Sequence, residues 1–133
     1  MANSCSSKKK LLALMKILTS NTDEKHPMTV KQIIDELKRY GINAERKSIY
    51  TDIDILCEFG IDIVCDKTRV NNYYVASRDF ELPELKLLVD AVQCSKFITS
   101  KKSKDLIKKI EKLASIHEAK ELHRDVIIED RVK

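Results

Sequence analysis

The sequence contains no tryptophan, and only two of its 133 residues are glycine and two are proline. These two residues interrupt regular structure more than others do, so their scarcity excludes a collagen-like or loop-dominated chain and favours a helix-rich fold. No stretch approaches the roughly 18 apolar residues of a membrane helix. The first seven residues are polar and Lys16 breaks the first apolar run, so no secretory signal is visible. We therefore expect a cytoplasmic protein that makes no contact with a membrane.

Spacings typical of metal, redox or catalytic chemistry are also missing. The cysteines are Cys5, Cys57, Cys65 and Cys94. No two of them are separated as in C-x-x-C, which favours reduced thiols, with an engineered or regulatory disulfide as the alternative. His117 and His123 lie near glutamates but without zinc-ligand spacing. The chain has no Gly-rich phosphate loop, nucleophile motif or paired carboxylates, so we expect no enzyme activity, no cofactor and no metal.

Charged residues are plentiful but nearly balanced, with 25 lysines and arginines against 21 aspartates and glutamates, a net charge of +4. A mildly basic chain is compatible with nucleic-acid binding but is not evidence for it, so the positions of the charges have to carry the argument. The densest basic stretch spans residues 96–112. Such a stretch is usually a solvated helix face, and an extended phosphate-binding surface is the alternative.

Two short helices with a tight connection are predicted in the first half of the chain. One is expected over residues 29–40, with Thr29 as N-cap and a glutamine three residues later that completes a capping box. The next is expected over residues 44–59, with Asn43 as N-cap. Gly41 lies in the short connection between them and is well placed as a helix stop. Two short helices joined in this way are typical of a helix-turn-helix.

The hydrophobic pattern changes its period after these helices. Residues 61–66 alternate between apolar and polar, and residues 73–75 form a second β-prone run. The polar connection at 67–72 makes the pair a hairpin, and a hairpin in this place is the wing of a winged helix-turn-helix. We predict a mostly α protein with a small β-hairpin wing, divided into a disordered start at 1–7, a winged helix-turn-helix domain at 8–76 and a helical linker or dimerisation extension at 77–133.

The predicted extension carries more apolar positions than one pair of helices needs. Pro83 fits the first turn of its first helix, and residues 126–128 resemble the start of a strand. Packing between the helices explains part of the apolar stripe, and a contact between two copies of the chain is the alternative. The positions are Leu85, Leu88, Val89, Val92, Leu106, Ile107, Ile110 and Leu113.

A helical wheel of residues 44–59 separates an apolar edge from an opposite face whose side chains suit a major groove. Residues on the flanks of that face and on the wing suit phosphates or a minor groove. Asp52, Asp54 and Glu58 would repel phosphates, so the helix is expected to enter DNA with its N-terminal end first. An ordinary solvated face is the alternative. The candidate DNA-binding residues are Ala44, Lys47, Ser48 and Thr51 on the face, Arg46 and Tyr50 on its flanks, and Lys67 and Arg69 on the wing.

Residues 43–53 (NAERKSIYTDI) and 58–63 (EFGIDI) resemble the N-terminal winged helix-turn-helix region of WYL-domain transcriptional regulators. The similarity continues through 73–75 (YYV), 78–93 (RDFELPELKLLVDAVQ) and 96–99 (KFIT), and covers nearly the whole chain from its first predicted helix. The resemblance implies sequence-specific binding of double-stranded DNA by a regulator of transcription.

The chain also departs from that family. Thr51 stands where these regulators often carry an arginine, and Asn71 and Asn72 replace glycines before the tyrosines of the wing. The sensor domain of the family would begin after Val126 and is absent, so no small-molecule or nucleotide effector is implied.

The sequence therefore predicts a DNA-binding transcriptional regulator, with helix 44–59 in the major groove and wing 67–72 on the backbone or minor groove. A single winged helix reads few base pairs, so we expect a homodimer on a near-palindromic site. The alternative is a protein–protein docking module built on a winged helix.

Overall fold

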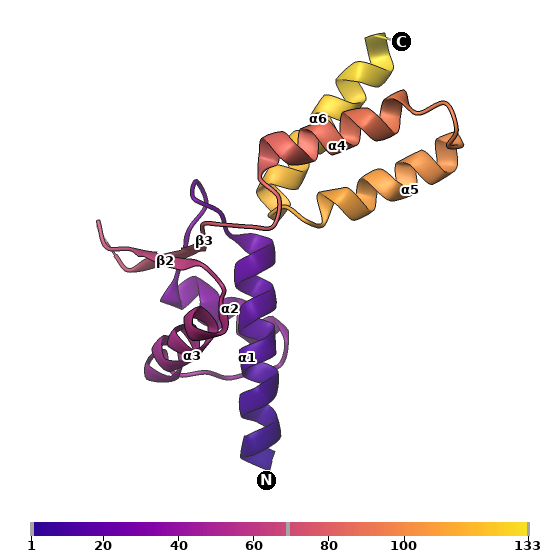
Figure 1. Ribbon diagram of the computed structural model, residues 1–133. Coiled ribbons are helices and arrows are strands. Elements are labelled where there is room, and N and C mark those ends of the chain that lie inside the picture. The colour runs from indigo at the N-terminus through magenta and orange to yellow at the C-terminus, as the bar shows by residue number, and fades with distance from the viewer. Residues whose placement is uncertain (1, 69, 133) are drawn as a thin grey trace. The chain divides into compact units, whose positions relative to one another are not determined.

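The structure is a computed structural model that describes residues 2–68 and 70–132, with side-chain surroundings given for residues 6–68 and 70–126. It divides into two compact units, Met1–Ser77 and Arg78–Lys133 (Figure 1). The described residues form six helices and one three-stranded antiparallel sheet. The predicted fold class, mostly helical with a small β component, is confirmed. None of the described helices is both long enough and apolar enough to cross a membrane.

Helix α1, Ala2–Asn21, supplies much of the core of the first unit. Its side chains Leu14, Ile17 and Leu18 are fully buried. The helix begins earlier than the sequence indicates, because the described residues of the predicted disordered start are already helical. That polar segment contains no helix breaker, so adding turns to an anchored helix costs little.

Helix α2, Val30–Arg39, begins as its capping box predicts. The backbone N–H of Gln32 donates to the Thr29 hydroxyl at 3.2 Å, and the backbone N–H of Thr29 donates to the Gln32 side chain at 2.9 Å. The connection to the next helix contains Gly41, whose φ of 74° is in the left-handed region that glycine adopts without strain.

Helix α3, Arg46–Phe59, begins two residues later than predicted, and its N-cap is Glu45 rather than Asn43. Ile42 and Ala44 both pack against the core while Asn43 is exposed, so the segment before the helix is extended. An extended backbone buries these alternate side chains together, which one helical turn cannot do.

The sheet has the order β1–β3–β2, and all pairs are antiparallel. The predicted hairpin consists of β2, Ile63–Asp66, and β3, Asn72–Val75. A third strand, β1, Met28–Thr29, pairs with the other edge of β3 and was not predicted. It is only two residues long and directly precedes α2, so it carries no alternating pattern that would reveal it.

A buried hydroxyl fastens α1 to the sheet. Strand β1 pairs only with the first two residues of β3, so it ends before Val75. The backbone N–H of Val75 donates instead to the hydroxyl of Thr22 at 3.0 Å, and that hydroxyl donates to the carbonyl of Leu18 at 2.6 Å. Thr22 is completely buried. Its side chain thus takes the place of a longer β1.

The second unit consists of α4, Leu82–Cys94, α5, Ser100–Glu111, and α6, Ile116–Val132. Pro83 lies in the first turn of α4, as predicted. The predicted strand at 126–128 is wrong, because α6 continues through these residues. Leu122 is buried and Val126, one turn later, packs against the same core, so a helix keeps both on one face. The buried core residues of this unit are Leu85, Val89, Ile107, Ile110, Ala114 and Leu122.

We predict that Thr22→Val lowers the free energy of unfolding by about 1–3 kcal/mol, because it leaves the buried N–H of Val75 without an acceptor. Urea unfolding measures the change. The control is Thr51→Val, whose hydroxyl is exposed and bonds within its own helix. A control effect within about 0.5 kcal/mol is expected for such a surface change. Equal effects of the two variants would show that the Thr22 hydroxyl is not structurally important.

Candidate nucleic-acid interface

The N-terminal turn of α3 presents two exposed cations, Arg46 and Lys47. The opposite edge of the helix is held in the core by Ile49, Ile53 and Leu56, which are all buried as predicted. The N-terminus of a helix also carries a partial positive charge from its unpaired N–H groups. This end of α3 therefore carries two cations and the positive end of the helix dipole, beside one exposed carboxylate, that of the N-cap residue Glu45.

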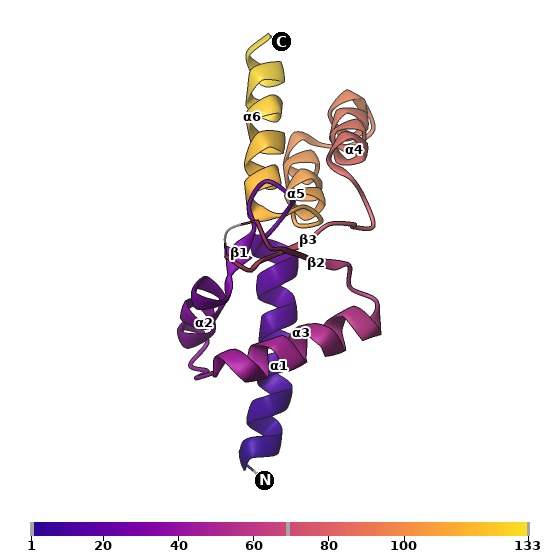
Figure 2. The same ribbon diagram turned by 90° about the vertical axis from the view of Figure 1, so that its left-hand side faces the viewer.

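The β2–β3 hairpin extends toward the N-terminal end of α3. The thiol of Cys57, in the last turn of α3, lies 3.7 Å from the carbonyl oxygen of Ile63, where β2 begins. Earlier in α3, Tyr50 packs against Tyr73 with ring centroids 6.5 Å apart. Since Tyr73 pairs with Cys65 near the end of β2, the strand runs back along α3 toward the N-terminal end of that helix. Figure 2 shows the two elements running in opposite directions.

Lys67 follows β2 directly and is exposed. The connection that it begins therefore lies at the end of the unit where Arg46 and Lys47 begin α3. Arg69, the other predicted wing cation, lies outside the described residues. We call Arg46, Lys47 and Lys67, the exposed cations of the first α3 turn and of the start of the hairpin connection, the basic end.

The hydroxyls on the outward face of α3 are already engaged as donors. The Ser48 hydroxyl donates to the carbonyl of Glu45 at 2.8 Å, and the Thr51 hydroxyl donates to the carbonyl of Lys47 at 3.3 Å. Each oxygen keeps lone pairs that can accept from an amino group. In this geometry the two side chains offer acceptors to a partner rather than donors.

Two predicted site residues lie elsewhere. Ala44 precedes the helix and packs against the core, so its methyl group is not on the outward face. Tyr50 is half-buried against Tyr73 and the core, so it supports the hairpin. Burial raises the pKa of Tyr73 to about 12, with further contributions from Cys65. The phenol beneath Tyr50 therefore stays neutral at physiological pH.

An ion pair changes the charge of α3 in a way that the sequence does not reveal. Lys10 of α1 lies 3.1 Å from the carboxylate of Asp52, and both side chains are mostly buried, at 14% and 13% exposed. Asp52 was expected to repel phosphates, but its charge is balanced by this contact. Exposed carboxylates remain at Asp54 and Glu58, toward the C-terminal end of the helix.

The start of the hairpin connection is ordered by a local turn. The backbone N–H and the hydroxyl of Thr68 donate to one oxygen of Asp66, at 3.1 and 2.6 Å. These two hydrogen bonds, the hydroxyl one first, lower the pKa of the Asp66 carboxyl. The turn fixes the backbone on both sides of Lys67.

Among the described residues, no group of three or more histidine, cysteine, aspartate or glutamate side chains is placed to hold a metal ion. Cys57, Cys65 and Cys94 are free thiols. The chain matches no protein-family model, no curated protein and no solved structure. The basic end is therefore the feature from which a function has to be argued.

We predict that Thr68→Val raises the pKa of Asp66 toward its ordinary value near 3.8, because the hydroxyl hydrogen bond favours the charged form. A group with a lowered folded pKa stabilises above its unfolded pKa, and this stabilisation is lost as pH falls through the folded value. The wild-type turn should therefore persist to lower pH than that of the variant. Carboxyl NMR titration measures both values, and Thr51→Val is the control. An unchanged Asp66 titration in Thr68→Val would contradict the assigned cause.

Proposed function

We propose that residues 8–76 form a winged helix-turn-helix domain that binds double-stranded DNA in a sequence-specific manner, and that the chain is a transcriptional regulator without enzymatic activity. The basic end of Arg46, Lys47 and Lys67 is the observation that carries this proposal. The order of elements also supports it, since a short connection joins α2 to α3 and a hairpin follows. The resemblance to WYL-domain regulators agrees with it, and we propose a relationship to their N-terminal region.

The proposed binding mode follows from the distribution of charge along α3. The helix enters the major groove with its first turn, where Lys47 contacts guanine acceptors or a phosphate. Ser48 and Thr51, one turn apart on the outward side, accept from the exocyclic amino groups of adenine or cytosine. Arg46 and Lys67 contact the phosphate backbone and set the orientation. The exposed carboxylates at Asp54 and Glu58 keep the other end of the helix away from the phosphates.

A protein-docking function is the second candidate, and a different observation favours it. Ile55 and Phe59 lie one turn apart in the C-terminal half of α3 and keep 42% and 80% of their surfaces exposed. An apolar pair of this kind suits a protein partner rather than a nucleic acid. Salt dependence distinguishes the two functions, because only phosphate binding releases condensed counterions.

Lys67→Ala is expected to weaken binding to all duplexes alike and to reduce the slope of log K against log salt by about 1. The matched control is Lys16→Ala, because Lys16 lies on the exposed side of α1, away from the buried Ile17 and Leu18. Fluorescence anisotropy on a random-sequence duplex measures both. If wild-type binding is absent or independent of salt, DNA binding is not the function; an unchanged slope for Lys67→Ala alone removes the hairpin from the interface.

Lys47→Ala is expected to weaken binding to a selected site by about 1–3 kcal/mol while changing the affinity for random DNA much less, because Lys47 is assigned to base edges. Selection from a pool of random duplexes supplies the site. Competition titrations of the variant and of Lys16→Ala then compare selected with random DNA. Equal losses on both kinds of DNA would make Lys47 a phosphate contact and leave the base readout unassigned.

A further inference from the structure

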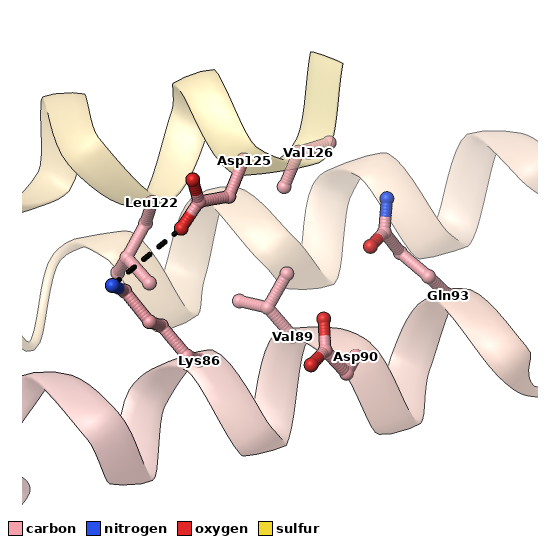
Figure 3. A pocket seen from close by; sticks show the side chains of 7 residues that line it. All are labelled: Lys86, Val89, Asp90, Gln93, Leu122, Asp125 and Val126. Atoms are coloured by element: carbon pink, nitrogen blue, oxygen red, sulfur yellow. Dashed lines mark ion pairs between the residues drawn. The ribbon is translucent and has the colours of Figure 1, made fainter. Parts of the chain in front are cut away.

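The α4–α5 hairpin of the second unit packs against α6 on one of its sides. Lys86 of α4 lies 3.7 Å from Asp125 of α6, and Glu111 of α5 lies 3.4 Å from His123 of α6. Figure 3 shows that Lys86, Val89 and Gln93 line a pocket together with side chains of α6. Lys104 of α5 lines a second pocket with Val126 of α6, so these residues mark the α6 side of each helix.

Helical geometry identifies the residues of α4 and α5 that point away from α6. Two residues along a helix correspond to a rotation of about 200°, so residues two positions from those that face α6 point the opposite way. On α4 these are Glu84 and Leu88, two residues before and two after Lys86. On α5 they are Lys102, Leu106 and Lys109, and Leu113 lies in the turn just after the helix, each of them two residues from Lys104 or Glu111. We call this side, made by these six residues, the open face.

The open face is only partly covered by the described part of its own unit. Leu88, Leu106 and Leu113 keep 37%, 38% and 43% of their surfaces exposed, although Leu85 and Ile110, three residues before Leu88 and Leu113, are buried. Three leucines that are each about two fifths exposed on one side of two packed helices are more than single scattered surface residues. A group of this kind marks a contact surface.

The two helices of the hairpin differ in charge. Residues 81–94 carry three acidic residues and one lysine, and that lysine is the one paired with Asp125. Residues 100–112 carry six lysines and two acidic residues. On the open face itself, α4 presents the carboxylate of Glu84 and α5 presents Lys102 and Lys109, whereas Asp90 lines the pocket with α6. A face that is acidic on one helix and basic on the other complements a second copy of itself, provided that unlike helices meet.

We propose that the open face is the contact between two copies of this chain, with α4 of each copy lying over α5 of the other. The two-fold axis then runs parallel to the helices, because an axis perpendicular to them would stack the lysine-rich helices on each other. Leu88 and Leu106 are each nine residues from Phe97 in the connection between α4 and α5, so they lie at one level along the hairpin. In the dimer Leu88 faces the partner's Leu106, and Glu84 faces the partner's Lys109.

The first test is the oligomeric state of the full chain, measured by sedimentation equilibrium from about 1 to 100 micromolar, a range that covers weak specific interfaces. The wild type is expected to be a dimer, and Leu88→Glu and Leu106→Glu to weaken it by about a hundredfold or more, because a carboxylate would be buried without a partner. The control is Leu12→Glu, since Leu12 is exposed on α1 in the other unit. Circular dichroism and thermal unfolding verify that each variant is folded. A wild type that is monomeric throughout, or a folded Leu88→Glu that dimerises as well as the wild type, would overturn the proposal.

The second test addresses which helices meet. Glu84→Lys and Lys109→Glu are each expected to weaken the dimer about threefold to tenfold at low salt, because each places like charges opposite each other. The double variant restores unlike pairs and is expected to lie within about twofold of the wild type. This recovery also controls for the capping hydrogen bond that Glu84 makes to the backbone of Glu81. Failure of the double variant to recover would overturn the stacking of α4 on α5.

The proposed dimer does not depend on the proposed DNA binding, so experiments can contradict either proposal while the other holds. If both hold, monomeric Leu88→Glu should bind random duplex DNA with the salt dependence of a single domain and lose most of the preference for a palindromic selected site. If the wild type dimerises but binds no DNA at any salt concentration, the dimer stands and the proposed function falls.

Discussion

The hydrogen bond between the Thr22 hydroxyl and the backbone N–H of Val75 is the constraint on which the first unit depends. Strand β1 is too short to satisfy that N–H, and water cannot reach it because Thr22 is buried. The hydroxyl can reach it only if the end of α1 stays close to β3. Because β3 carries both β1 and β2 on its edges, this one distance positions the whole sheet against the helix. The direction in which the hairpin leaves the unit follows from the same contact.

The charge of α3 depends on that positioning in turn. Lys10 can neutralise Asp52 only because α1 lies across α3, as Figure 2 shows. With Asp52 paired, the exposed carboxylates are confined to the C-terminal half of the helix, while the cations Arg46 and Lys47 occupy the first turn. The helix is therefore electrically polar along its length through its side chains as well as its backbone. The hairpin adds Lys67 at the positive end because β2 runs antiparallel to α3.

Local signals in the sequence predicted local features well. The capping box at Thr29 and the glycine stop after α2 appear in the structure where the sequence indicates them, because each is decided within a few residues. Features decided by tertiary packing were missed. The segment around Ala44 is extended because its side chains pack against residues far away in the sequence. The Lys10–Asp52 ion pair joins α1 to α3, and no spacing in the sequence indicates which residues of two separate helices will meet. The run at 126–128 has β-branched residues typical of a strand, yet α6 continues through it, with Leu122 and Val126 on the core of the second unit.

The two units differ in how completely they enclose their own cores, and this difference bears on the proposed function. In the first unit the helices, the sheet and the extended segment around Ala44 surround the buried leucines and isoleucines. In the second unit α6 covers one side of the α4–α5 hairpin, and the leucines of the open face remain partly exposed. In the proposed binding mode, a single α3 with Lys47, Ser48 and Thr51 would reach only a few bases, so its specificity would be limited by the number of contacts. Joining two copies through the second unit makes binding of the second helix intramolecular, which raises affinity for paired sites without any new contact to DNA. If the proposed DNA binding and the proposed dimer both hold, the incompletely covered second unit supplies the second set of DNA contacts that a single copy lacks.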